Sequence, residues 1–444
     1  MKTIKFLFAT EERVTREQYL KWGLVLMLVK YLVEALGCYL LADRIYTPFN
    51  FLTPLFHQRF PEYDATPALI PLYVLWSLPF IWIGVGMSIR RAVDAGKNPW
   101  YALLFFVPGI NFLVMGALSY YPSSAEAWET SRVRVDQKGL KNQLLISLVF
   151  ICIGILLAWI SVHFYKMYGS SLFVGTPLIL GFVQANYLTN VTGATWKQVV
   201  KHLTMTLVLM HLGLLIFMLE GIFCLAMAFP IAWVLALIGG MFGYQIALFN
   251  KDKIKPMMLM ALLPLMPAIE KNTFHAEPSV VLSSIDVHVA PEKVWPNVVS
   301  FPDLDPTEDF FFRNGVATPL RARIVGTGVG AIRHCEFTTG SFVEPITVWD
   351  EPTRLAFDVK EQPAPMKELT FYEVIDAPHL KGFFRSIKGE FRLVRTETGT
   401  RLEGRTWYEV EMGPQWYWQM YGEFFIHKIH LRVLNHIKKI SEKV

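Results

Sequence analysis

The pattern of apolar and polar positions divides the chain into two parts with different periods. Before residue 279 the chain contains long apolar runs, each near the roughly 20 residues that a membrane-spanning helix needs. From residue 279 the runs shorten and alternate, as in VVLSSIDVHV at 280–289, which is typical of a half-buried strand. The pattern therefore predicts a polytopic α-helical membrane region followed by an α+β domain.

Six apolar runs are uninterrupted and are predicted to cross the bilayer: 22–42, 69–89, 143–162, 171–190, 203–226 and 230–249. Two further runs are ambiguous. The run 100–120 is broken by Pro108 and Gly109, and the run 257–268 is short and contains two prolines. The C-terminal domain lies on the same side whether both or neither of these runs cross, and on the other side if only one of them crosses.

Loop charge favours the arrangement in which only the six uninterrupted runs cross. The segments that are then cytoplasmic hold 17 Lys and Arg residues against 3 in the outer segments, as the positive-inside rule requires. If all eight runs cross, the counts are 9 inside and 11 outside. We therefore expect 100–120 to be a re-entrant or interfacial hairpin, 257–268 to be a shallow helix, and both termini to be cytoplasmic.

Composition and charge support a membrane location. Hydrophobic residues make up 53% of the chain and charged residues 18%. Residues 1–274 carry 22 Lys and Arg against 14 Asp and Glu, whereas residues 275–444 carry 20 against 23. The basic excess thus lies in the apolar part, where it reads as loop charge at a membrane surface and not as a nucleic-acid interface. The predicted domains are 1–125, 126–274 and 275–444.

Several residues inside the apolar runs need a reason to be there. Glu220 lies within the run 203–226, and an ionisable group at that depth is either functional or a hydrogen-bonded packing group. Lys30 and Glu34 are one helical turn apart and are expected to pair. Small residues between Ala232 and Gly243 allow close helix contact.

The stretch SIRRAVDAGKNPWYALLFFVPGIN at 88–111 is the most specific motif of the membrane region. It predicts a helix end at the inner surface, with Arg90 and Arg91 at the lipid phosphates, Asp94 paired with either, Gly96 as C-cap and Trp100 as an interface anchor. The order R-x-x-D-x-G-x-x-x-W before an apolar run resembles a family of small bacterial inner-membrane proteins of unknown function, over about residues 13–120. The resemblance implies an inner-membrane location and no known activity. The proline-rich segment 43–68 is longer than in that family.

The C-terminal part predicts one strand, a helix that Pro291 opens, six further antiparallel strands and a long helix after Pro414. Its segments IDVHVAPEKVW at 285–295, FPDL at 301–304 and WDEPTRLAF at 349–357 resemble the START-like and polyketide-cyclase (SRPBCC) superfamily. The resemblance covers about residues 279–442. It implies a helix-grip fold, in which a curled sheet wraps the last helix around an apolar cavity.

Periodicity nominates the residues that would line such a cavity. The terminal helix offers Tyr417, Tyr421, Phe424 and His427, which are expected to face Phe391, Thr406 and Tyr408 on the strands. In strand AIRHCEF, alternation leaves open whether Arg333 or Glu336 points inward. An alternative is that the aromatic residues simply close a packed core.

Catalytic, cofactor and metal sites are not predicted. His427 and His430 could converge on zinc with His334 and Glu336, but no motif connects the two segments. Acid–base work by His427 with Glu336 or Tyr408 is chemically possible, as in the cyclase and aromatase relatives that the resemblance implies. The long insertion 361–382 predicts either a lid over the cavity or a strand extension.

We therefore expect a multi-pass inner-membrane protein that presents a cavity for a lipid, quinone or other apolar small molecule. Its expected partners are membrane lipids and that ligand, without nucleic acid. A membrane-tethered cyclase-like enzyme, or a structural or sensory module with a filled core, are the alternatives.

Overall fold

The computed structural model describes residues 2–53, 69–106, 109–131, 140–250, 254–370 and 377–443. Its contacts form two compact units, each discontinuous in sequence. The helical unit consists of Met1–Ile160, Ser171–Leu212 and Phe229–Ile269. The C-terminal unit consists of Ser161–Ser170, Gly213–Ala228 and Glu270–Val444. The expected soluble domain thus folds together with two short segments of the membrane region.

The first 270 residues are helical, as predicted. Their elements are α1 (Lys2–Phe8), α2 (Arg16–Ala42), α3 (Pro48–Leu52), α5 (Leu69–Asp94), η1 (Pro99–Phe106), α6 (Ile110–Tyr120), α7 (Ala125–Ser131), α8 (Leu140–Trp159), η2 (Ile160–Phe164), η3 (Ser171–Gly175), α9 (Thr176–Thr192), α10 (Trp196–Ile216), α11 (Ile222–Phe249), α12 (Ile254–Met258), η4 (Leu259–Leu262) and α13 (Met266–Glu270). Among the described residues, five helical stretches are long and apolar enough to cross a membrane: Arg16–Leu41, Gln143–Phe164, Ser171–Thr192, Trp196–Ile216 and Ile222–Phe249. Helix α5 covers the remaining predicted run.

Helices α9 and α11 pack backbone to backbone and run parallel. A Cβ atom added to Gly239 would lie 2.0 Å from the carbonyl oxygen of Leu178, and one added to Gly243 would lie 2.0 Å from that of Phe182. Both contacts advance by four residues on each helix, so the two chains run in the same direction. The predicted close contact of the small residues in α11 is confirmed.

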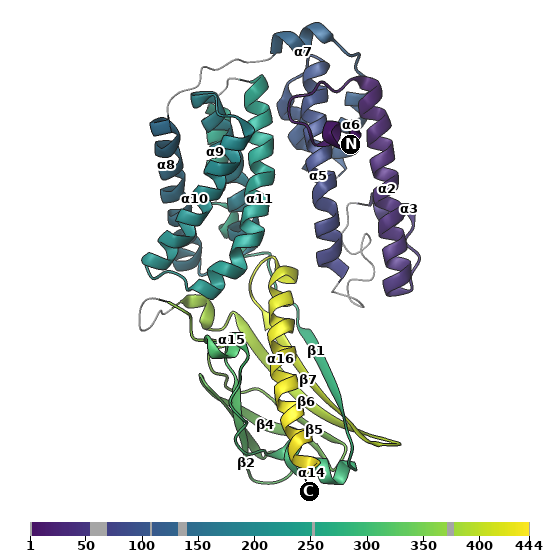
Figure 1. The fold of residues 1–444 in the computed structure, drawn as a ribbon, viewed down its shortest axis with the longest axis vertical. Coiled ribbons are helices and arrows are strands. Elements are labelled where there is room, and N and C mark those ends of the chain that lie inside the picture. Colours follow the sequence, from purple (N-terminus) through teal and green to yellow (C-terminus); the bar gives the residue numbers. More distant parts are fainter. Residues whose placement is uncertain are drawn as a thin grey trace. The chain divides into compact units, whose positions relative to one another are not determined.

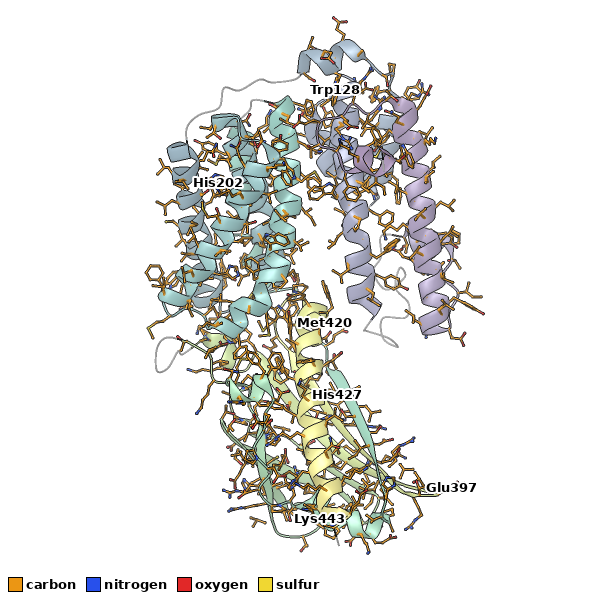
Figure 2. The ribbon with its side chains drawn as sticks, in the orientation of Figure 1. Trp128, His202, Glu397, Met420, His427 and Lys443 are labelled. Carbon is orange, nitrogen blue, oxygen red and sulfur yellow. The ribbon has the colours of Figure 1, made fainter. Side chains whose placement is uncertain are left out.

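A polar network joins α8, α9 and α10 inside the helical unit, where Figure 2 labels His202. The ring nitrogens of His202 lie 3.0 Å from the hydroxyl of Ser147 and 3.1 Å from the amide oxygen of Gln143. Gln184 donates to the hydroxyl of Thr206 at 2.7 Å. These bonds satisfy polar groups that would otherwise be buried without partners.

The segment after α11 returns along α9. Elements α12 and η4 pack against α9, and Leu263 belongs to the core of the helical unit. A Cβ on Gly175, at the start of α9, would lie 2.4 Å from the terminal methyl of Met266. Because α11 runs parallel to α9 and ends beside its C-terminal half, the residues 254–269 run back toward the start of α9. The run 257–268 is thus divided into short helical pieces, and its predicted shallow position in the membrane stays a prediction.

The run 100–120 leaves α5 and comes back to the same end of it. Element η1 follows the end of α5 directly, and α6 is only 11 residues long, which is too short to span a bilayer. Arg91, in the last turn of α5, donates to the carbonyl oxygens of Leu118 and Tyr121. The segment thus returns like a hairpin, and its re-entry into the membrane stays a prediction.

The C-terminal part forms a seven-stranded antiparallel sheet with one long helix across it (Figure 1). Its elements are β1 (Ser279–Val287), α14 (Pro291–Val299), α15 (Phe310–Arg313), β2 (Pro319–Val325), β3 (Ile332–Phe337), β4 (Gly340–Asp350), β5 (Arg354–Asp358), η5 (Pro378–Leu380), β6 (Phe384–Thr396), β7 (Gly399–Val410) and α16 (Gln415–Ser441). The strand order is β1-β7-β6-β5-β4-β3-β2, so that the first two strands of the sequence form the two edges. The predicted strands, the helix that Pro291 opens and the helix after Pro414 are all confirmed.

The C-terminal half of α16 closes the core of this sheet. Val433, Leu434 and Ile437 are buried against Leu355 on β5 and Leu402 on β7, among other apolar residues. Such fully buried side chains each contribute about 1.5–3 kcal/mol to stability. The sheet and α16 are therefore held together firmly at this end, and the part of α16 from Trp418 to Leu434 bounds a cavity.

Candidate functional site

A cavity of about 220 Å³ lies inside the C-terminal unit, bounded by the sheet and α16. This volume is an order of magnitude above the roughly 10–15 Å³ that one water molecule needs. Its lining is mostly apolar and includes residues of α11, of the segment 362–366 and of strands β3 to β7. The first residues of the insertion thus line the cavity, whereas Phe371 and Tyr372 lie outside the described residues.

One face of α16 lines the cavity, and only some of the predicted residues lie on that face. Trp418, Tyr421, Phe425 and Ile429 line it. Phe424 is 44% exposed and His427 is exposed as well, on the side of α16 that carries Met420 (Figure 2). The prediction that Phe424 and His427 line the cavity is wrong, because they lie roughly 140–160° around the helix from the centre of the face that does.

The strand residues divide in a similar way. Thr406 and Phe391 line the cavity. Tyr408 is fully buried beside it, and its hydroxyl lies 3.4 Å from the backbone oxygen of Gln419. Tyr417 is buried too, but its hydroxyl donates to the backbone oxygen of Met227 at 2.6 Å. These two tyrosines therefore fix α16 in place and are not among the lining residues.

A buried ion pair sits in the cavity wall. Arg333 is 2% exposed, and its guanidinium pairs with Glu344 and lies 5.3 Å from the ring centre of Phe357. Its Nε atom has no hydrogen-bond partner. Glu336 faces the other side of β3, where it accepts from Arg321 at 2.7 Å. Of the two orientations that alternation left open, the structure has Arg333 inward, and Glu336 does not reach the cavity.

Burial sets the protonation of the groups around this pair. Burial lowers the pKa of Arg333, but the charge of Glu344 outweighs it and raises the pKa above its usual value. Burial also raises the pKa of the Cys335 thiol to about 12. The wall therefore presents a cationic guanidinium and a neutral thiol at neutral pH.

His430 is the polar group that α16 turns into the cavity. Its Nδ1 lies 3.0 Å from the hydroxyl of Ser283, and its Nε2 lies 2.8 Å from that of Thr406. His427 shares the same Ser283 hydroxyl at 2.7 Å. Burial, reinforced by His427, lowers the pKa of His430 to about 4. His430 is thus a neutral ring, and the described residues do not bring it together with His334 and Glu336 in a metal-binding group.

A second polar cluster borders the cavity where Cys224 and His379 line it. The Nε2 atom of His379 lies 2.8 Å from the sulfur of Cys224 and 3.1 Å from Oε1 of Glu368. Its Nδ1 atom lies 2.9 Å from Oε2 of Glu220, and Tyr168 donates to the other oxygen of Glu220. Side chains from the turn after α8, the start of α11 and the insertion thus meet at one imidazole.

Glu220 does not lie in a membrane span, contrary to the prediction. It lies in the turn between α10 and α11, where Met218 has a positive φ of 58°. The apolar run 203–226 continues through this turn, so hydropathy alone does not reveal it. Burial by itself would lower the pKa of His379, but the contacts and charges of Glu220 and Glu368 outweigh it and raise the pKa to about 9.

Sequence reasoning missed Cys224, Glu368 and His379. Cys224 and His379 are 155 residues apart, and no local motif connects them. The available signal was indirect: a histidine and a carboxylate inside an unusually long insertion, and an acidic residue four positions before a cysteine.

The charged side chains of the motif around Arg90 are buried inside the helical unit. Arg90, Arg91 and Asp94 are all 0% exposed. Arg90 donates to the backbone oxygens of Phe6, Leu7 and Glu12 at 3.2–3.3 Å.

The remaining residues of this motif are structural as well. Asp94 accepts from both Arg91 and Arg13. Gly96 has the left-handed φ of 64° expected of a C-cap. The ring of Trp100 packs on that of Phe182 at 5.7 Å. The motif therefore holds the ends of α1, α5 and α6 together, and the predicted contacts of its arginines with lipid phosphates are wrong.

Comparison with known proteins found one family match for the N-terminal part. Residues 7–129 match the family described as "Protein of unknown function (DUF805)". Among curated proteins, none matches the chain.

Several solved structures resemble the C-terminal part. A norcoclaurine synthase of Thalictrum flavum is 13% identical, with 38% of this chain and 98% of that chain covered and a TM-score of 0.26. The Zhui aromatase/cyclase of Streptomyces sp. R1128 is 12% identical, with 38% and 95% covered and a TM-score of 0.25. A protein of Mesorhizobium loti is 13% identical, with 37% and 98% covered and a TM-score of 0.23.

The order of the seven antiparallel strands and the helix across them define the fold of the C-terminal part independently of these matches. Residues 7–129 thus match the DUF805 model, and the C-terminal part has a helix-grip arrangement, in which an antiparallel sheet packs around one long helix.

Proposed function

We propose that the C-terminal unit binds an apolar small molecule, such as a lipid or a quinone, in the cavity between its sheet and α16. The observation that carries this proposal is the cavity itself, which is lined mostly by apolar side chains. Each buried methylene of a ligand contributes about 0.8 kcal/mol, so an eight-carbon segment supplies roughly 6 kcal/mol before the entropy cost of binding. That is enough to retain a ligand without any catalytic group.

The polar groups of the lining would orient such a ligand. The unpaired Nε of Arg333 is a donor inside the apolar wall, and His430 adds a neutral ring held by two hydroxyls. A few polar groups in an apolar pocket are the usual source of orientation and specificity. An oxygen-bearing head group fits this pattern better than a pure hydrocarbon.

We also propose that the C-terminal unit lies on the outer side of the membrane. The unit includes residues 161–170 and 213–228: Gly413 donates to the backbone oxygen of Tyr168, and Ile222 donates to that of Leu369. These two segments hold a single Lys or Arg, Lys166. The segments at the opposite helix ends, 132–141, 197–201 and 251–255, hold nine. The positive-inside rule then makes the latter cytoplasmic.

This orientation replaces the expectation that both termini are cytoplasmic. Segments 163–170 and 275–444 were expected on opposite sides, yet residues that share hydrogen bonds lie on one side. The return of residues 254–269 along α9 supplies the additional passage. The loop-charge count survives, because a long C-terminal domain is translocated largely regardless of its own charge.

Filling the cavity tests the binding proposal. Ile429→Trp adds volume to the lining face of α16, whereas Met420→Trp adds the same side chain to its exposed face. Native mass spectrometry of the full chain, purified with its lipids, should show a retained small molecule on the parent and on Met420→Trp, but not on Ile429→Trp. Equal retention by both variants contradicts the proposal. So does a failure of Ile429→Trp alone to accumulate, since a packed core rejects volume that a cavity accepts.

Reporter fusions test the orientation. Alkaline phosphatase fused after residue 443 should be active, because it folds only outside the cytoplasm, and a green fluorescent protein there should be dark. The same reporters fused after residue 252 should give the opposite result. Fluorescence at both positions would place the C-terminal unit in the cytoplasm.

A further inference from the structure

We propose that Cys224, His379 and Glu368 bind a divalent transition-metal ion of the zinc type at the edge of the apolar cavity. Thiolate, imidazole and carboxylate together form a ligand set that Zn²⁺ favours. This inference goes beyond the proposed binding of an apolar molecule and does not depend on it.

The geometry around the imidazole assigns the ligand atoms. Glu220, Cys224 and His379 each offer an atom within 4.8 Å of the others. A ring nitrogen binds only one ion, however, and the two nitrogens of His379 face different partners. Cys224 and Glu368 both lie at Nε2, at 2.8 and 3.1 Å, whereas Glu220 lies at Nδ1. Ligand atoms around a tetrahedral zinc are roughly 3.3–3.6 Å apart, so the sulfur of Cys224 and Oε1 of Glu368, now 2.8 and 3.1 Å from Nε2, would each move away from it by roughly 0.2–0.8 Å.

Glu220 then has the role of orienting the histidine. A metal-bound histidine almost always gives its other ring N–H to a carboxylate or carbonyl oxygen, which fixes the ring and increases its basicity. Oε2 of Glu220 lies 2.9 Å from Nδ1 of His379, and Tyr168 donates to the other oxygen of the same carboxylate. The chain Tyr168–Glu220–His379 therefore ends at the nitrogen that faces Cys224.

Buried atoms in this cluster have unused bonding capacity. The side chains of Glu368, His379 and Glu220 are 1%, 6% and 11% exposed. Oε2 of Glu368 has no hydrogen-bond partner, whereas Oε2 of Glu220 and Nδ1 of His379 face each other at 2.9 Å. Unsatisfied polar atoms of this kind are rare in folded proteins and call for an explanation such as an ion.

A bound ion is compatible with the charges of the cluster. Among the described residues, His379 is the one cationic group recorded within ion-pair distance of Glu220 or Glu368. A divalent cation would replace two protons, one on Nε2 of His379 and one on the thiol of Cys224, so its binding leaves the net charge of the cluster unchanged.

The proposed site has room for an exogenous ligand. Three protein ligands leave one tetrahedral position, the arrangement of catalytic zinc sites and not of structural ones. Cys224 and His379 both line the cavity, so this position faces the apolar ligand. An oxygen atom of that ligand, or a water molecule, is the chemistry that fits there.

Metal content tests the site directly. The full chain, purified in detergent without added chelator, should carry about one equivalent of zinc by elemental analysis. Cys224→Ser, His379→Asn and Glu368→Gln should each lose it, whereas Cys152→Ser, which changes an exposed cysteine elsewhere, should keep it. Glu220→Gln should bind zinc about 10–100-fold more weakly while reaching the same stoichiometry at saturation.

Cobalt substitution keeps the test decisive where a variant fails to accumulate. A parent chain in which Cys38, Cys152 and Cys335 are serine retains Cys224 alone. Loaded with Co²⁺, it should show a thiolate-to-cobalt charge-transfer band. A missing band, or zinc binding that survives both Cys224→Ser and His379→Asn, overturns the proposal. Retention of the apolar molecule is measured separately, so either proposal can fail without the other.

Discussion

Two of the buried clusters of charged side chains among the described residues differ in how completely their atoms are paired. In the helical unit, Arg90 donates to backbone oxygens of α1 and the segment after it, and Arg91 and Asp94 bind each other. In the cluster around His379, Oε2 of Glu368 is buried without a hydrogen-bond partner. A buried charged cluster in which every polar atom has a hydrogen-bond partner serves to hold the fold together. A cluster in which a polar atom has no partner is a candidate ligand-binding site.

The two clusters also differ in what sequence revealed of them. The arginine motif was conspicuous, because its residues lie within eleven positions, yet its role was misread. Two adjacent arginines at the end of an apolar run look like a lipid contact. Nothing local shows that the backbone oxygens of α1 and α6 come to meet them.

The largest expected effect is on the paired cluster. Arg91→Met leaves the oxygens of Leu118 and Tyr121 without their donor and should destabilise the chain by about 3–5 kcal/mol. Thermal unfolding in detergent measures this. Arg13→Met, which removes the partly exposed partner of the same Asp94, should cost about 1 kcal/mol or less. An equal loss from both variants would show that the buried arginine is not special.

A smaller effect should come from His430, which is buried, hydrogen-bonded and neutral. The pKa of His430 is about 4 in the folded chain against the usual histidine value of 6.5, so between these pH values only the unfolded chain binds the proton. Stability is therefore fully present above pH 6.5 and falls as the pH drops, by about 3 kcal/mol at pH 4. His430→Gln should flatten this part of the pH profile of the unfolding temperature. If the parent and the variant lose stability in parallel, His430 is not the group responsible.

The smallest effect should come from the unsatisfied cluster. A Cβ on Gly221 would lie 2.0 Å from Oε2 of Glu368, so Gly221→Ala should displace that carboxylate. We expect zinc affinity to fall at least tenfold, or about 1.4 kcal/mol, with little change in accumulation. Gly116→Ala is the matched control, since its Cβ would meet nothing within 4 Å. Unchanged zinc affinity in Gly221→Ala would remove Glu368 from the site.

Sequence alone predicted the secondary structure of both parts well, because hydrophobic period is a local property. Alternation placed Thr406 correctly on the inner face of β7. It could not choose between two neighbouring stripes of α16, because both are aromatic: Phe424 is exposed, whereas Phe425 lines the cavity. Only the contact with the sheet decides between them.

The candidate metal site was beyond local reasoning for a different reason. Hydropathy reads MLEG at 218–221 as part of one span, although the chain turns there. Glu368 and His379 come from an insertion whose position depends on the backbone bond between Ile222 and Leu369. Such a site exists only once segments far apart in sequence have met.

The discontinuity of the C-terminal unit sets an order of events during biosynthesis. Residues 161–170 and 213–228 leave the ribosome long before strands β1 to β7, and they separate helices that insert first. The sheet therefore completes itself against parts that are already anchored, and a fragment cut at residue 275 lacks Cys224, Glu220 and Tyr168. A fusion that moves this domain to another protein would therefore have to include residues 161–170 and 213–228.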